Sequence, residues 1–185
     1  MNLALSIEEE LKKLQADMEE MHIFHMTNLD EEMKLNLPGL MGKHKNRKIT
    51  LDFVPWEEKK IFCVIYLTAC FPFEISITQK VEQTQERFMR GRQPFSIVEL
   101  SDPEFQNRWI VESYNAPLVK TFLEDQKNLN LIKELGDFER LTIDLKYLKF
   151  SKLLNFDEGI KAKELLRLIN LLERLACQSE ASCKI

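Results

Sequence analysis

The stretch IFCVIYLTA, Ile61–Ala69, decides the fold because it opens the longest apolar block of the chain. Its β-branched and aromatic residues favour a strand, and the block is too short to cross a bilayer as a helix. Apolar side chains occupy both faces of this segment, which is typical of a strand with neighbours on both sides. We therefore expect Ile61–Ala69 to be a central strand of a sheet.

Shorter strands are predicted on both sides of this segment. Apolar and polar residues alternate around Ile49, Leu51 and Phe53, until Pro55, and again around Phe73, Ile75 and Ile77. Such alternation places one face of each strand in the core and the other in water. Further strands are expected around residues 94–100 and at residues 141–147. On the latter, one face carries Leu141, Ile143, Leu145 and Tyr147.

Residues 101–123 predict a turn, a strand and a helix in that order. Pro103 follows two short polar residues, which favours a turn. The strand that follows is expected to place on one face Phe105, Trp109 and Val111. Asn115 is a good N-cap for the helix, with Pro117 in its first turn, where a missing backbone N–H costs nothing.

The first helix is predicted from a capping box, Ser6 with Glu9, which satisfies free backbone N–H groups at a helix start. Five apolar residues follow at spacings of four, three, four and three: Ile7, Leu11, Leu14, Met18 and Met21. We call these five residues the apolar seam. Their rhythm is that of a coiled coil, and it also suits packing of the acidic helix 6–26 on its own domain.

A long amphipathic helix is expected from about Asp157, because apolar residues recur there at helical spacing. They are Ile160, Leu165, Leu168, Ile169, Leu172 and Leu175. The order of elements predicts an α+β fold, with a mainly antiparallel sheet of about five to six strands covered by this C-terminal helix. Residues 1–40 are expected to be an N-terminal amphipathic helix and linker, and residues 41–185 a single domain.

Composition bears on the partner and the compartment. The net charge of −4 gives no general attraction for nucleic-acid phosphates. The basic run 43–48 suits a solvated loop, with contact to an anion or to an acidic, peripheral membrane surface as the alternative. The chain starts without the basic and long apolar regions of a signal peptide. The cysteines form no CxxC motif, so we expect a cytoplasmic protein without disulfides, in which Cys63 is a small core residue. No cofactor is predicted.

One further pattern is the order in which an acidic residue, a strand, an Asn-capped helix, a later strand and a long last helix follow one another. It is carried by Asp102, Phe105, Trp109, Val111, Asn115, Phe122 and Leu123, then by Leu141–Leu145 and the helix from Asp157. Over roughly residues 41–178 this order resembles a family of uncharacterised prokaryotic domains, often found behind N-terminal transmembrane helices. The resemblance implies the fold and supplies no catalytic residues. Here the acidic helix 6–26 stands in place of the transmembrane helices.

Candidate chemistry is sparse. Three arginines around a glycine, Arg87, Arg90 and Arg92, suit either a solvated loop or a grip on a phosphate or carboxylate. His22 and His25 have HxxH spacing, with His44 or Cys70 as further ligands, but two ligands do not make a metal site, so none is predicted. The sequence shows no nucleophile with a base and an orienting carboxylate.

Two functions remain open from sequence. The first is a non-catalytic interaction or scaffold domain, whose apolar seam binds a protein partner or a second copy of the chain. The second is a small anionic-ligand-binding or hydrolytic domain that uses Arg87, Arg90 and Arg92. We prefer the first, because it asks nothing of residues that the sequence lacks.

Overall fold

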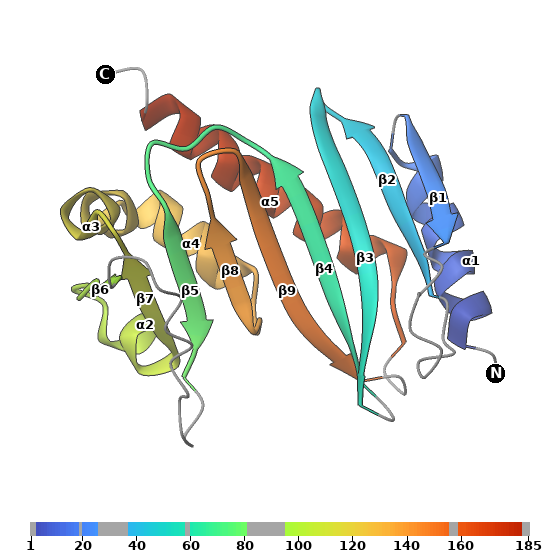
Figure 1. Ribbon diagram of the computed structural model, residues 1–185, viewed down its shortest axis with the longest axis horizontal. Coiled ribbons are helices and arrows are strands. Elements are labelled where there is room, and N and C mark those ends of the chain that lie inside the picture. Colours follow the sequence, from blue (N-terminus) through green and yellow to red (C-terminus); the bar gives the residue numbers. More distant parts are fainter. Residues whose placement is uncertain are drawn as a thin grey trace.

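Figure 1 shows the computed structural model, in which an antiparallel sheet carries helices on one face. The structure describes residues 3–18, 20–25, 37–57, 60–80, 95–155 and 159–182. The strands are β1 (Met21–His25), β2 (Pro38–His44), β3 (Arg47–Glu57), β4 (Lys60–Thr68), β5 (Ile75–Gln79), β6 (Ser96–Ile97), β7 (Trp109–Ser113), β8 (Arg140–Ile143) and β9 (Tyr147–Asn155). The helices are α1 (Leu3–Ala16), α2 (Pro103–Arg108), α3 (Ala116–Glu124), α4 (Gln126–Glu134) and α5 (Ala162–Ser182).

Neighbouring strands are antiparallel throughout the described sheet, in the order β1-β2-β3-β4-β9-β8-β5-β7-β6. The predicted α+β class, antiparallel sheet, N-terminal helix and C-terminal helix are confirmed. The predicted strand number of five to six is wrong, because the sheet has nine strands. The sequence predicts a helix where β1 forms, a solvated loop at residues 43–48, where β2 ends and β3 begins, and one strand where β8 and β9 form a hairpin.

The central strand is β4, as predicted, and it lies between β3 and β9. Cross-strand pairing aligns one buried residue from each strand of the sheet from β2 across to β7, both included. In order across the sheet these are Leu40, Leu51, Ile65, Phe150, Leu141, Ile77 and Val111, all at most 2% exposed. We call this set the inner row. A shift of one strand by one residue would turn its member away from the core, so the inner row fixes the register.

Helices cover the face that bears the inner row. Figure 1 shows α5 running diagonally behind the sheet, with α1 behind β1 and β2 and α4 beside α5. The predicted stripe is buried at Leu165, Leu168, Ile169, Leu172 and Leu175, whereas Ile160 precedes α5, which begins at Ala162, and is only partly buried. Within the described ranges, no helix combines the length and apolar character needed to span a membrane.

The N-terminal helix is shorter than predicted and belongs to the main core. It ends at Ala16, and the chain then turns into β1, which pairs with β2. Gly42 of β2 permits this turn, because a Cβ at that position would lie 2.0 Å from the carbonyl oxygen of Glu20. β1 and β2 continue the sheet, and α1 packs in the same hydrophobic cluster. The division after residue 40 stays a prediction.

The segment 101–123 contains a helix that the sequence analysis missed. Asp102 caps α2 by accepting a hydrogen bond from the Phe105 backbone N–H at 2.8 Å, and Pro103 occupies its first turn. Phe105 is therefore helical, and its ring contacts Trp109 with centroids 4.9 Å apart. The predicted N-cap is confirmed, since Asn115 accepts a hydrogen bond from the Leu118 N–H at 3.3 Å.

The predicted strand at 141–147 is a tight hairpin instead. The backbone N–H of Asp144 donates to the carbonyl oxygen of Tyr147 at 2.9 Å, which closes the turn between β8 and β9. Leu145 and Tyr147 are consequently exposed at 47% and 39%, and do not share the buried face of Leu141 and Ile143. Apolar alternation alone did not reveal a turn made by only a few residues.

A carboxylate of α1 caps the start of α5. Oε2 of Glu10 accepts a hydrogen bond from the backbone N–H of Ala162, the first residue of α5, at 2.8 Å. This bond, followed by the ion pair with Lys13, holds the pKa of Glu10 below its usual value. A negative charge at a helix N-terminus satisfies a free N–H group and interacts favourably with the helix dipole. The first and last helices are thus tied together by one side chain.

We expect Glu10→Gln to lower the free energy of unfolding by about 1 kcal/mol, because it weakens this cap. The pKa of Glu10 is lowered on folding, so its contribution is present above the unfolded pKa and is lost as pH falls through the folded pKa. Urea denaturation of both proteins at neutral and acidic pH measures this. Glu9→Gln, on the exposed side of the same helix, is the matched control. Equal effects of the two substitutions would contradict the capping role.

Candidate docking surface

The face of the sheet opposite the helices carries a patch of apolar side chains. We call this side the open face. Its apolar patch consists of Met41, Val54, Trp56, Phe62, Val64, Tyr66 and Leu153. Strand alternation puts these residues on the side opposite the inner row. Soluble antiparallel sheets usually present polar side chains on an uncovered face, so this patch departs from the common pattern.

The centre of the patch is a cross-strand row. Val54 of β3 pairs with Phe62 of β4, and Phe62 pairs with Leu153 of β9. Trp56 stands edge-on against Phe62, with ring centroids 5.0 Å apart. Trp56 is nevertheless 61% exposed and Val54 44% exposed. A large aromatic side chain held in place by a neighbour but open to solvent is the type of residue that anchors protein interfaces.

Two opposite charges flank the patch. Asp52 of β3 is only 9% exposed, and burial raises the pKa of its carboxyl group, while a hydrogen bond from the Phe53 backbone acts in the opposite direction. Lys149 of β9 lies over the ring of Tyr66, with its ammonium 5.1 Å from the ring centroid. Neither has an ion-pair partner in the part of the chain that the structure describes.

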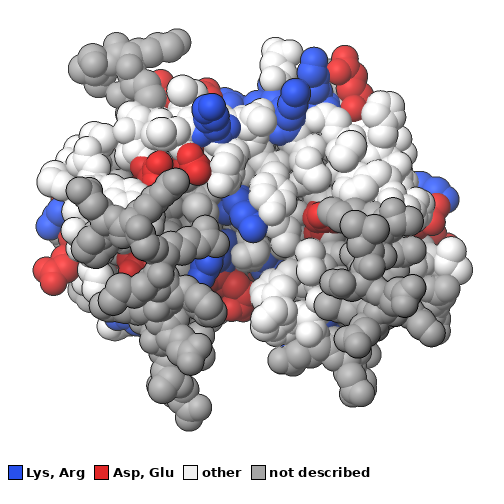
Figure 2. Space-filling model, in the orientation of Figure 1, with Lys and Arg blue, Asp and Glu red and all other residues white. Residues whose placement is uncertain are grey.

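Other basic residues lie on the same face. Lys43 of β2 is directly opposite Lys48 of β3, and both side chains are exposed. Arg140 of β8 is also exposed there. Like charges opposite each other on a sheet are mildly destabilising, so an acidic group brought by a partner would improve this arrangement. Figure 2 shows this face, where Lys and Arg side chains gather along the upper edge and uncharged atoms fill much of the remaining described part.

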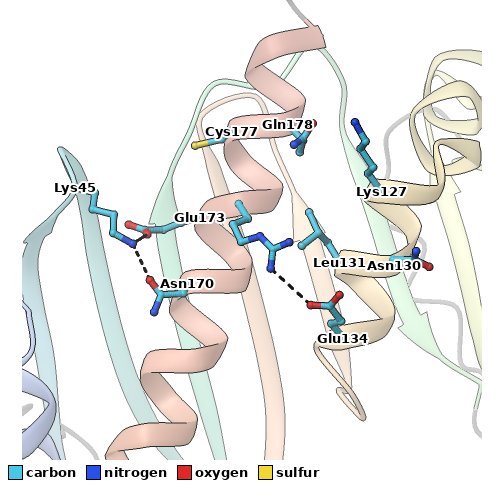
Figure 3. Close-up of a pocket in the computed structure, with 10 residues that line it drawn as sticks. Lys45, Lys127, Asn130, Leu131, Glu134, Asn170, Glu173, Cys177 and Gln178 are labelled. Carbon is cyan, nitrogen blue, oxygen red and sulfur yellow. Dashed lines mark hydrogen bonds and ion pairs between the residues drawn. The ribbon is translucent and has the colours of Figure 1, made fainter.

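A second surface feature lies on the helix side. An open groove of about 690 Å³ runs between the β2–β3 turn, α5 and α4. Figure 3 shows Lys45 reaching from the turn toward α5, with α4 bordering the groove on the other side. The Lys45 ammonium donates to Asn170 Oδ1 at 2.7 Å and to Glu173 Oε2 at 2.8 Å. The other Glu173 oxygen, Oε1, is buried without a hydrogen-bond partner in the described ranges.

The groove offers little free chemistry. Its two carboxylates are already ion-paired, Glu173 with Lys45 at 2.8 Å and Glu134 with Arg174 at 3.7 Å. The unpartnered oxygen of Glu173 is shielded from the groove by its own burial. A groove of this kind can hold a polar group weakly, but both of its carboxylates, together with Lys45 and Arg174, are engaged within the chain.

The apolar seam lies in the core of its own chain. Ile7, Leu11 and Leu14 are at most 1% exposed, and α1 contacts β1, β2 and α5. Met18 and Met21 are buried as well, but they lie in the turn after α1 and at the start of β1. The seam is therefore not a single helical stripe, and its side chains are occupied while α1 stays docked.

The histidines are not brought together. His22 and His25 lie on the strand β1, where residues three apart point to opposite faces, and His25 faces Glu8 of α1. His44 is buried at the end of β2. Over the described ranges, no three potential metal-ligating side chains form a group. A helix would have put His22 and His25 on one side, but a strand does not.

The cysteines separate into two classes. Cys63 is buried in β4, where burial raises the pKa of its thiol to about 12, so it is the core residue that the sequence predicts. Cys70 and Cys177 are exposed and free. Arg47 Nη2 donates to the Cys177 sulfur at 3.5 Å, and the same guanidinium makes two hydrogen bonds to Glu180, at 2.8 and 2.7 Å. Cys183 lies outside the described residues.

The arginine loop of the alternative function cannot be placed. Arg87, Arg90 and Arg92 lie within residues 81–94, outside the described ranges, so that hypothesis remains a prediction. Trp109 of β7 and Tyr114, which follows this strand, are engaged within the chain. Trp109 is 4% exposed, and Tyr114 stacks on Phe95 with centroids 4.0 Å apart.

No protein-family model matches the chain, and no curated protein matches it. The resemblance to a prokaryotic family of unknown function therefore stays a prediction. A solved structure, that of the mycobacterial trehalose monomycolate transport factor A, TtfA, has a similar fold, with a TM-score of 0.55. The alignment covers 92% of this chain and 96% of that chain at 12% sequence identity. At this identity the similarity concerns the fold alone.

The burial of the apolar seam predicts a large effect on stability. Leu11→Ala should lower the free energy of unfolding by about 2–5 kcal/mol, because it leaves a cavity between α1 and the sheet. Leu5→Ala is the control on the same helix, since Leu5 is 59% exposed, and it should change stability little. Thermal and urea denaturation of the full chain measure both. Similar, small effects of the two substitutions would show that α1 does not pack in cis.

Proposed function

We propose that this protein is a non-catalytic interaction domain, which docks a protein partner through the apolar patch of the open face. The observation that carries the proposal is the row Val54, Phe62 and Leu153, with Trp56 held against it and largely exposed. The apolar seam does not serve this role here, because its residues are part of the core.

The patch has the composition of an interface centre. Aromatic residues are enriched in protein interfaces, and exposed apolar patches on soluble domains commonly mark binding sites. The three strands that carry the patch are the middle of a nine-stranded sheet, so their backbones are held by hydrogen bonds on both sides. A partner would meet a rigid surface and would lose little binding energy to ordering it.

Features elsewhere in the described chain support a non-catalytic role. The carboxylates of the helix-side groove are engaged in ion pairs, and the three histidines are dispersed over β1 and the end of β2. General acid–base catalysis needs such groups to be free and within reach of a reacting atom. A cytoplasmic location is part of the proposal, and the free thiols of Cys63, Cys70 and Cys177 suit a reducing compartment.

Trp56→Ala is expected to weaken partner binding by about 2 kcal/mol or more, since aromatic anchors dominate interface energetics. The measurement is affinity capture from an extract of the source organism, with the tagged full-length chain and quantitative mass spectrometry. Proteins lost from the Trp56→Ala sample identify partners of the open face. Folding of the variant is checked by its thermal unfolding.

Leu5→Ala is the matched control, because Leu5 is exposed to a similar extent, 59%, on the helix side. It should capture the same proteins as the unaltered chain. Identical sets of captured proteins from all three chains would mean that the open face is not a docking surface.

A further inference from the structure

We propose that the partner of the open face is a second copy of this chain, docked sheet to sheet about a two-fold axis parallel to β4. This inference rests on the proposed function and names its partner. Two antiparallel sheets that pack face to face lie about 10 Å apart and keep their strands roughly aligned. The arrangement is isologous, so every contact occurs twice.

The two-fold axis determines which strands meet. β3 and β9 lie on the two sides of β4, and β2 and β8 lie one strand further out. Rotation about an axis along β4 therefore places β3 over β9 of the second copy, and β2 over its β8. Residues that share a level in one sheet then face each other across the interface. The register of the strands defines these levels, so the contacts of the dimer follow from it.

Apolar residues meet apolar residues in this arrangement. Val54 and Leu153 lie at the same level of the sheet, because both pair with Phe62. Val54 of one copy therefore faces Leu153 of the other. The half-buried β4 residues Phe62 and Tyr66 lie along the axis and face the same strand of the second copy, while Val64 between them is only 7% exposed. Residues on a two-fold axis must suit their own copies, and uncharged side chains do. At the centre of the interface, apolar side chains of each copy thus cover those of the other.

Opposite charges also meet. Asp52 shares its level with Val64 and Ser151, so it faces Ser151 of the second copy. Lys149 of that copy is two residues further along β9, about 7 Å away, which the flexible stem of a lysine spans. A short acidic side chain on one sheet and a long basic one on the other fit a 10 Å spacing. The largely buried, unpaired Asp52 carboxylate would gain a cation.

A second charge pair lies at the rim. Lys43 pairs with Lys48 in the sheet, and Lys48 is level with Thr68 and Tyr147 by continuation of the register. Asp144 closes the β8–β9 turn at that same level, through its hydrogen bond to Tyr147. Lys43 of one copy therefore faces Asp144 of the other. Arg140 is level with Ser151, and faces β2 of the second copy at its apolar and glycine positions.

The test is the oligomeric state of the full-length chain, measured by sedimentation velocity over a series of protein concentrations. The unaltered chain is expected to form a dimer. Lys149→Asp should raise the dimer dissociation constant by about tenfold or more. The substitution places two carboxylates opposite each other across the interface, and it leaves the desolvated Asp52 without a cation. The double variant Asp52→Lys with Lys149→Asp should restore a large part of the lost affinity, since it re-creates the pair with its signs exchanged.

Val54→Lys keeps the test valid if the Asp52 variant does not fold. Val54 is 44% exposed in the single chain, so a lysine is tolerated there, but in the dimer it would face Leu153 and should abolish association. Ile97→Lys is the matched control, because Ile97 is 52% exposed on β6, at the edge of the sheet and outside the contact. It should dimerise as the unaltered chain does.

Any result other than these contradicts the proposed dimer. The inference fails if the unaltered chain stays monomeric at every concentration, or if its dimer is indifferent to Val54→Lys and Lys149→Asp. The proposed function can survive that failure, because proteins captured through Trp56 would then be heterologous partners. If Trp56→Ala also leaves the captured proteins unchanged, the proposed function fails with it.

Discussion

The inner row is the constraint on which the rest of the structure depends. One residue from each strand between β2 and β7 must point to the same side, and each is nearly inaccessible to solvent. Because side chains alternate along a strand, this choice also decides which residues point the other way. Helices α1, α4 and α5 lie on the side of the inner row, where burial of apolar area drives their packing. The open face is the necessary counterpart of that arrangement.

The open face is not uniform, because its composition changes from one side of the sheet to the middle. Toward β5 and β7 it carries mainly polar residues, such as Ser76, Thr78 and Glu112, with Ile110 as an apolar exception. On β3, β4 and β9 the face also carries an apolar cluster beside Asp52 and Lys149, and Val54 and Trp56 of this cluster remain exposed. The same strands that form the centre of the core therefore carry the unusual surface. A solvated face needs no such residues, whereas an interface does.

Several local signals predicted well, but helix α2 and the β8–β9 turn were missed, as were contacts between distant segments. The central strand, the Asn115 cap and the α5 stripe follow from residues close together in sequence, and all three are present. Met18 and Met21 suit both a helix and a turn into β1, and only the approach of Glu20 to Gly42 decides between them. Pro55 suggests that a strand ends there, yet β3 continues to Glu57 past a bulge between Pro55 and Glu57. That continuation is what puts Trp56 on the open face, so the candidate site escaped the sequence analysis.

The two sides of the molecule differ in whether their charged side chains have partners within the chain. On the helix side, carboxylates are matched within the chain, as in Glu10 with Lys13 and Ala162 and Glu180 with Arg47. On the open face, Lys43, Lys48 and Lys149 have no acidic partner in the described ranges, and Asp52 has no basic one. The net charge of −4 conceals this asymmetry. The open face thus has unpaired charges of both signs around an apolar centre, and such a surface is complementary to another surface of the same kind. A two-fold axis supplies that second surface from another copy of the chain.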